Sequence, residues 1–143
     1  MINFITGIES TTAALQAERV RMAVASQNIS NSEITHGLDG KPYQRQSVVF
    51  ESVLAKQQGG LGGTDAQKVQ ISRIVKDQSP PRLVYKPGDP EADPETGMVA
   101  MPNVNIHEEM ADMIVASRAY EANLAVVRNA RSMAMQTLQM GKA

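Results

Sequence analysis

The stretch NVNIHEEMADMIVASRAYEANLAVVRNARSMAMQTLQM, residues 103–140, decides the fold of this chain. It contains neither glycine nor proline, the two residues that most strongly disfavour a helix. At 1.5 Å per residue, the helix that it predicts is about 55 Å long, longer than a compact domain of this size is wide. A 4,3 repeat of mostly apolar positions, interrupted only by a serine and an arginine, predicts a coiled-coil-type seam: Ile106, Met110, Met113, Ser117, Tyr120, Leu124, Val127, Arg131, Ala134 and Leu138.

The sequence also predicts where this helix begins and that it has a second apolar face. Pro102 precedes it, Asn105 can cap it, and Glu108 follows three residues after the cap. Beside the main seam runs a second apolar stripe, made of Val115, Ala119, Ala122, Val126 and Met133. Because a helix that is apolar on two faces needs at least two neighbours, we expect part of this surface to be covered by other subunits.

A second helix is predicted at the amino terminus. Thr6 and Glu9 form a capping-box pattern, which predicts that the helix begins there. The short polar side chains of residues 28–32 compete for backbone hydrogen bonds and predict its end. Its main apolar stripe has a seven-residue spacing and consists of Ile8, Leu15, Met22 and Ile29.

The middle of the chain has a different character, because all seven prolines lie between Pro42 and Pro102. Residues 43–50 and 69–75 are rich in β-formers, and residues 80–85 must be extended. Residues 57–64 hold four glycines, Gly59 to Gly63, and predict a flexible loop or hairpin tip. We therefore predict an α+β fold, in which the long terminal helices pack as an antiparallel coiled-coil-like core and the middle of the chain forms a small β-rich domain. The predicted divisions are an N-terminal core helix (1–34), a β-rich middle domain (35–102) and a C-terminal core helix (103–143).

Composition excludes several functions. The net charge of −1 gives no electrostatic footprint for nucleic acid, and no apolar run is long enough to span a bilayer. The chain has no cysteine and no basic segment near its start, so we expect neither a disulfide framework nor a cleaved secretory signal. P-loop and nucleophile-elbow motifs are absent, and His36 and His107 lack the spacing of a shared metal site. We expect no cofactor, no metal and no enzymatic activity.

Two motifs carry a resemblance to a known family. Residues 101–114 (MPNVNIHEEMADMI) and 117–123 (SRAYEAN) resemble the C-terminal signature of bacterial flagellar basal-body rod proteins, and residues 28–31 (NISN) resemble their N-terminal motif. Residues 79–88 (SPPRLVYKPG) and the short length resemble the proximal rod members in particular. The similarity covers nearly the whole chain.

The resemblance implies a structural subunit of the proximal rod, the flagellar drive shaft, which polymerises through its terminal helices into a tube that transmits torque. It implies export by the flagellar type III apparatus without signal cleavage, and a location in the periplasm-spanning rod of the basal body. The implied partners are further copies of the chain, other rod proteins and the membrane-ring junction proteins, with no direct membrane insertion. A distal rod or hook-type subunit, and a cytoplasmic helical adaptor or chaperone, are the alternatives.

The candidate functional residues are those expected at subunit interfaces. They are Ile8, Leu15, Met22, Asn28, Ile29, Asn31, Ile106, Met110, Met113, Ser117, Tyr120, Leu124, Val127 and Leu138. Arg131 on the seam either extends to solvent or fixes the register of packing. Glu108, Glu109 and Asp112 could form an acid/base cluster in a hydrolase, but carboxylates in the first turns more often stabilise the helix dipole.

Overall fold

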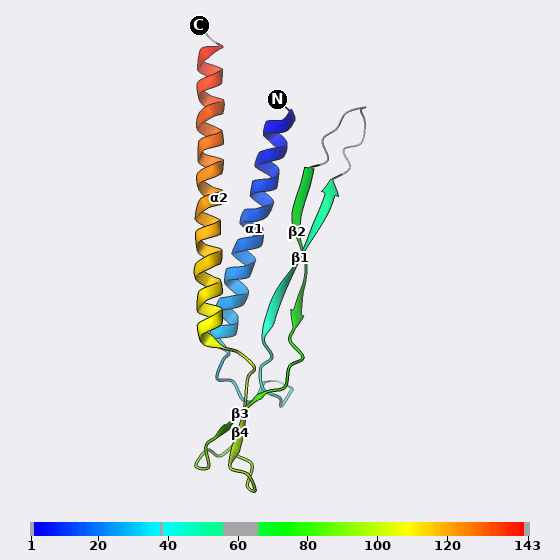
Figure 1. Ribbon diagram of the computed structural model, residues 1–143, viewed down its shortest axis with the longest axis vertical. Helices are drawn as coiled ribbons and strands as arrows, with labels where there is room; N and C mark the ends of the chain where they lie inside the picture. The colour runs from blue at the N-terminus through cyan, green and yellow to red at the C-terminus, as the bar shows by residue number, and fades with distance from the viewer. Residues whose placement is uncertain (1, 38, 56–65, 142–143) are drawn as a thin grey trace.

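Two long helices run side by side and antiparallel in the computed structural model, which describes residues 2–37, 39–55 and 66–141. They are α1 (Ile2–Ser30) and α2 (Ile106–Met140). Figure 1 shows that α2 extends beyond the amino-terminal end of α1. The predicted α+β class with packed terminal helices is confirmed.

The beginning of α2 agrees with the sequence. The Asn105 side chain accepts a hydrogen bond from the His107 N–H at 3.2 Å and donates one to Oε1 of Glu108 at 2.9 Å. The cap satisfies one of the amides that a helix leaves without an internal partner, and it holds the Glu108 carboxylate beside the positive end of the helix dipole.

The predicted beginning of α1 is wrong. The helix begins at Ile2 and passes through Thr6 and Gly7, so no capping box forms at Thr6. A single glycine inside a helix costs only about 1 kcal/mol, which a helix of 29 residues can absorb. The helix ends at Ser30, within the polar stretch where the sequence predicts its end.

The described part of the middle region forms two separate two-stranded antiparallel sheets. The first pairs β1 (Gln46–Ala55) with β2 (Ala66–Lys76), and its register shifts between Val49 and Phe50. This hairpin lies along α1, on the side away from α2 (Figure 1). The predicted loop at residues 57–64 lies outside the described residues.

The second sheet is a short ribbon at the end of the molecule opposite the carboxyl terminus (Figure 1). It pairs β3 (Arg82–Tyr85) with β4 (Met98–Met101). The loop between the strands ends at Gly97, whose φ of +65° is a conformation that favours glycine.

The core is thin and lies mainly between the helices and where they meet the strands. Its fully covered apolar side chains on the helices are small. Among the described residues, the buried apolar side chains are Ala17, Val24, Ala25, Val99, Met101, Val104 and Ala116. Ala116 is completely buried, although it lies on neither apolar stripe predicted for α2. The contact with α1 is therefore centred between those two stripes.

Candidate functional site

The residues predicted to lie at subunit interfaces fall into two groups in the single chain. The first group is at least partly covered and comprises Ile8, Leu15, Met22, Asn28, Ile29, Asn31, Met113, Ser117, Tyr120, Leu124 and Val127. The second group comprises Ile106, Met110 and Leu138, which are 39%, 51% and 66% exposed. The stretch of the α2 seam from Met113 to Val127 thus turns partly toward α1, while the two ends of the seam face outward. Their role between subunits stays a prediction.

A buried polar cluster lies where α1, β1 and α2 meet, and we name it the polar junction. It consists of Asn28, Tyr43, Arg45, Asn103 and Glu109. Glu109 is only 2% exposed, and its two carboxylate oxygens have separate partners. Oε1 accepts from Nε of Arg45 at 2.6 Å, and Oε2 accepts from Nδ2 of Asn28 at 2.9 Å. A buried carboxylate is tolerated only with such charge-assisted partners.

Asn28 holds α1 to the beginning of β1. Its Nδ2 donates to the Gln46 carbonyl at 2.8 Å as well as to Glu109, while its Oδ1 accepts from the Gln46 N–H at 2.9 Å. The Tyr43 hydroxyl donates a further hydrogen bond to Oδ1 at 2.9 Å. The side-chain amide thus pairs with a strand residue as a neighbouring strand would. All of its hydrogen-bonding capacity is used, which a completely buried asparagine requires.

The junction shifts the acidity of two of its members. Burial raises the pKa of the Tyr43 phenol, and the negative charge of Glu109 raises this pKa further. Burial alone would lower the pKa of Arg45, but its hydrogen bond and attraction to Glu109 outweigh burial and raise this pKa above the ordinary value. Both shifts favour the protonated form, so at neutral pH the tyrosine is neutral and the arginine carries its charge.

Asn103 joins the polar junction to the residues that flank the β1–β2 hairpin. Its Oδ1 accepts from the backbone N–H of Arg45 at 2.8 Å, and its Nδ2 makes longer contacts with the carbonyls of Asp77 and Ser79, at 3.4 and 3.3 Å. The segment just before α2 is thereby tied to the chain where it enters β1 and where it leaves β2.

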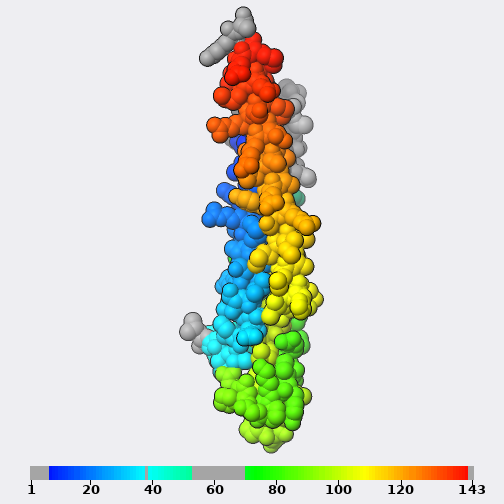
Figure 2. Space-filling model, turned by 90° about the vertical axis from the view of Figure 1, so that its left-hand side faces the viewer, coloured from blue at the N-terminus to red at the C-terminus, as the bar shows by residue number. Residues whose placement is uncertain are grey.

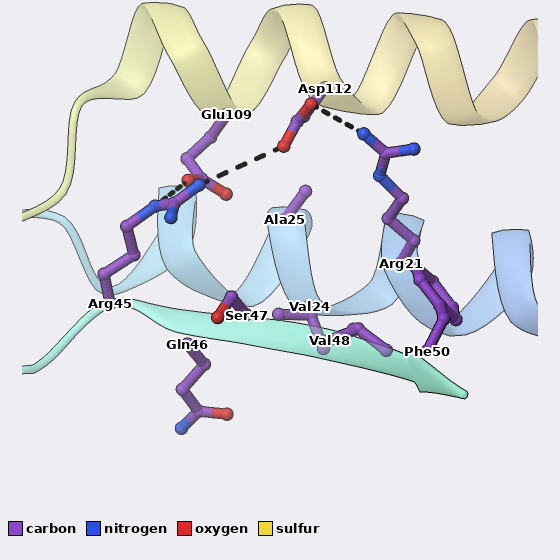
Figure 3. A pocket seen from close by; sticks show the side chains of 10 residues that line it. All are labelled: Arg21, Val24, Ala25, Arg45, Gln46, Ser47, Val48, Phe50, Glu109 and Asp112. Carbon is purple, nitrogen blue, oxygen red and sulfur yellow. Dashed lines mark hydrogen bonds and ion pairs between the residues drawn. The ribbon is translucent and has the colours of Figure 1, made fainter. Parts of the chain in front are cut away.

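A second ion pair lies nearer the middle of the helices and is more exposed. Arg21 of α1 donates from Nη2 to Oδ1 of Asp112 at 2.9 Å, with side chains 33% and 42% exposed. Asp112 also lies 4.0 Å from Nη2 of Arg45, so two arginines and two carboxylates alternate along the interface. Figure 3 shows these four side chains above the apolar Val24, Val48 and Phe50, around a cavity of about 390 Å³.

This arrangement is suited to holding elements together, because its carboxylates are engaged in hydrogen bonds and ion pairs. Glu109 and Asp112 each accept from an arginine, and Glu108 bonds the cap residue Asn105. Within the described part of the chain, no group of three or more His, Cys, Asp or Glu residues is placed to hold a metal ion. The carboxylates that could have suggested a hydrolase therefore serve the fold in this structure.

The sequence predicts a role for Asn28 but does not predict the partners that surround it. It predicts that Glu109 stabilises the helix dipole, and the structure also places this residue in the buried contact with α1. A signal was present, because residues 109, 113, 116 and 120 lie three or four apart and form one face of α2. A carboxylate on an otherwise apolar face requires a cationic partner, but the spacing could not identify Arg45.

Comparison with known proteins gives evidence about this chain that is independent of its structure. Residues 95–140, which include β4 and α2, match the family model described as "Flagellar basal body rod FlgEFG protein C-terminal". This match covers Asn103 and Glu109 of the polar junction and the whole of α2.

Relatives extend the similarity to most of the chain. The flagellar basal-body rod protein FlgC of Salmonella typhimurium is 39% identical over 130 residues, which cover 91% of this chain and 92% of the relative. FlgC of Bacillus subtilis is 38% identical, with 92% and 94% covered. FlgC of Borreliella burgdorferi is 36% identical, with 92% and 93% covered. At this identity and coverage, the chain belongs to the FlgC family of flagellar basal-body rod proteins.

Proposed function

We propose that this chain polymerises through its terminal helices into the proximal part of the flagellar rod, as one unit of a helical tube that transmits torque. Membership of the FlgC family makes it a structural subunit of the basal-body rod. The observation that carries the mode of assembly is the large surface that one copy leaves uncovered.

The exposed area of this chain can be compared with that of a compact monomer of the same mass. A compact monomer of 15.5 kDa exposes about 7,200 Å² by the usual scaling with mass. This chain exposes 10718 Å², roughly half as much again. The excess of about 3,500 Å² is in the range of large obligate interfaces. The elongated outline in Figure 2, with α1 and α2 lying together along one face, accounts for the excess.

Four of the exposed apolar side chains on α2 form an ordered stripe. Val115, Val126, Met133 and Met140 are 54%, 53%, 58% and 74% exposed. At 100° per residue they lie within about 40° of one another around the helix. This stripe lies beside the face that packs on α1. A straight apolar stripe on a helix that already has one partner supports packing against a helix of another subunit.

Partners and location follow from the same proposal. A basal-body location and association with other rod proteins follow from the family. We further propose contacts with further copies of the chain and with membrane-ring junction proteins, and export by the flagellar type III apparatus without signal cleavage. No described helix is both long and apolar enough to cross a membrane. We also propose that the subunit has no enzymatic activity, because its clustered carboxylates are engaged in folding contacts.

Substitution of Leu124 by aspartate tests the proposal. Leu124 is partly buried on the seam of α2, so an unpaired carboxylate there opposes close helix packing. In cells lacking the natural chain, we expect Leu124→Asp to abolish incorporation into purified basal bodies and to abolish motility. Circular dichroism of the purified variant should retain the β-sheet signal of the middle region.

The matched control is Ser132→Asp, which adds the same charge on the exposed polar face of α2 and should leave incorporation unchanged. Normal motility of the Leu124→Asp strain would contradict the proposal. Recovery of the natural chain only in the soluble cytoplasmic fraction, and never with basal bodies, would favour the adaptor alternative.

A further inference from the structure

The base of the β1–β2 hairpin is bound from three sides, at Arg45 and Gln46. The side-chain amide of Asn28, on α1, forms two hydrogen bonds with the backbone of Gln46, at 2.8 and 2.9 Å. Oδ1 of Asn103, just before α2, accepts from the backbone N–H of Arg45 at 2.8 Å. The Arg45 side chain donates to Glu109 on α2 at 2.6 Å (Figure 3). Both terminal helices are therefore attached to the same point of the hairpin.

The chain that leaves the hairpin is held at the same place. The N–H of Asp77, the residue after β2, donates to the Arg45 carbonyl at 2.8 Å. Nδ2 of Asn103 lies 3.4 and 3.3 Å from the carbonyls of Asp77 and Ser79. Asn103 thus connects the two segments that form the base of the hairpin. We name the hydrogen bonds of Asn28 and Asn103 to these segments the base clamp.

Beyond the base clamp, the hairpin is a long and narrow arm. At about 3.3 Å per residue, its strands of 10 and 11 residues are about 33–36 Å long. Within the described part of the chain, β1 and β2 pair only with each other. The arm packs along α1 on the side away from α2 (Figure 1). The chain therefore has an inner layer of two helices and a separate layer made by the hairpin.

Apolar packing fixes the position of this arm only weakly. Val49, Phe50 and Ile74 of the hairpin are 37%, 38% and 50% exposed, so much of its apolar surface is not in contact with α1. Apolar contacts are also not directional, whereas a hydrogen bond weakens steeply when its geometry changes. Asn28 is completely buried, and a hydrogen bond is stronger in such surroundings than in water. The base clamp therefore resists sliding of the hairpin along the helices.

We infer that the base clamp transmits torque between the helical wall of the rod and the hairpin, which lies outside that wall. A shaft resists twisting mainly through the material at its largest radius, but only if its layers cannot slide past each other. The base clamp supplies this connection inside each copy of the chain. The inference rests on the proposed function and adds which residues couple the two layers.

Replacing Asn103 by alanine tests the inference, because this residue is only half-buried and lies outside both helices. In cells whose only copy is Asn103→Ala, the subunit is quantified in isolated basal bodies, and small or large beads are attached to flagellar stubs. We expect near-natural incorporation and natural rotation of small beads. Under large beads we expect motors to lose drive severalfold more often than natural ones, seen as a change from driven rotation to free Brownian rotation. A variant that was merely less stable would reduce the number of rods, and the loss would not depend on the load.

The matched control is Gln78→Ala. Gln78 is an exposed amide in the same segment, and its Nε2 lies 3.4 Å from the carbonyl of Lys76, so this contact does not reach a helix. This variant should behave as the natural chain does at both loads.

The outcomes separate the inference from the proposed function. If Asn103→Ala incorporates and keeps drive under large beads as well as the natural chain does, the inference is wrong and the rod function stands. If Asn103→Ala does not incorporate, Asn103→Asp decides, because it keeps the acceptor for the Arg45 N–H and lacks the donor to Asp77 and Ser79. We expect the same load-dependent loss from it, and loss that is equal at both loads, or failure of both variants to incorporate, would overturn the inference. Absence of the natural chain from basal bodies would instead overturn the proposed function.

Discussion

Replacing Arg45 by methionine should severely destabilise the subunit, because it leaves the carboxylate of Glu109 buried without its cation. The two side chains are joined at 2.6 Å, and Glu109 is only 2% exposed, so its carboxylate depends on protein partners. Removing one partner of a buried ion pair costs about 3–5 kcal/mol. A domain of 143 residues has a stability of about 7–21 kcal/mol, so the loss is a substantial part of the total.

Urea denaturation of the purified subunit, followed by circular dichroism at 222 nm, measures this loss. With a slope of about 2 kcal/mol/M, the midpoint should fall by about 1.5–2.5 M. The matched control is Arg21→Met, which removes the partner of Asp112 from a pair that is 33% and 42% exposed. Solvent screens that pair, so we expect a loss below about 1 kcal/mol.

A double variant tests the cause of the effect. Adding Glu109→Gln to Arg45→Met removes the buried charge while keeping an oxygen that can accept from Asn28, so the double variant should be more stable than Arg45→Met alone. The reasoning is refuted if Arg45→Met loses no more stability than Arg21→Met, or if the second substitution destabilises the chain further.

Three other substitutions test local features of the structure. Ala116→Leu should destabilise the chain by about 1–3 kcal/mol in the same urea assay, because Ala116 is completely buried between the helices. Gly97→Ala should lower the melting temperature, because φ is +65° there and the added Cβ would lie 2.9 Å from the Tyr85 ring. Hydrogen bonds, chiefly from the Glu95 N–H, lower the pKa of Asp93; its contribution to stability is therefore present above the ordinary pKa of about 3.9 and is lost as pH falls through the lower native value. Asp93→Asn should lack this acid-dependent loss in unfolding curves measured at pH 6 and below.

Local chemistry explains what could be predicted from the sequence. The beginning of α2 follows from the side chain of Asn105 and the residues just after it, and the length of α2 follows from the absence of glycine and proline. The strands β1 and β2 likewise lie where β-forming residues gather, although β1 begins three residues later than predicted. Such features depend on neighbours within one or two turns of chain, which a sequence displays directly.

The polar junction could not be predicted, because its partners are remote in the sequence. Arg45 and Glu109 are separated by 64 residues, and Asn28 and Glu109 by 81. The sequence correctly predicts Glu109 in the first turn of α2, where it complements the helix dipole, but it does not predict that this turn packs against α1. The predicted beginning of α1 is wrong for a different reason, which is local in the sequence. The local pattern at Thr6 predicts a helix beginning there, but the residues before it continue the helix back to Ile2.

The polar junction also explains how a helix pair with such a thin core keeps one register. Among the described residues, the fully buried apolar side chains of α1 and α2 are alanines and a valine, and apolar contacts of this kind are not directional. If α2 slipped by one turn, about 5.4 Å, Glu109 would leave both Arg45 and Asn28, and its charge would stay buried without partners. The penalty of about 3–5 kcal/mol disfavours that register by a factor of more than 100. Because the stripe of α2 that we propose for subunit contacts lies on the same rigid helix, fixing its register at Glu109 also fixes where Val126 and Met133 are presented to a neighbouring subunit.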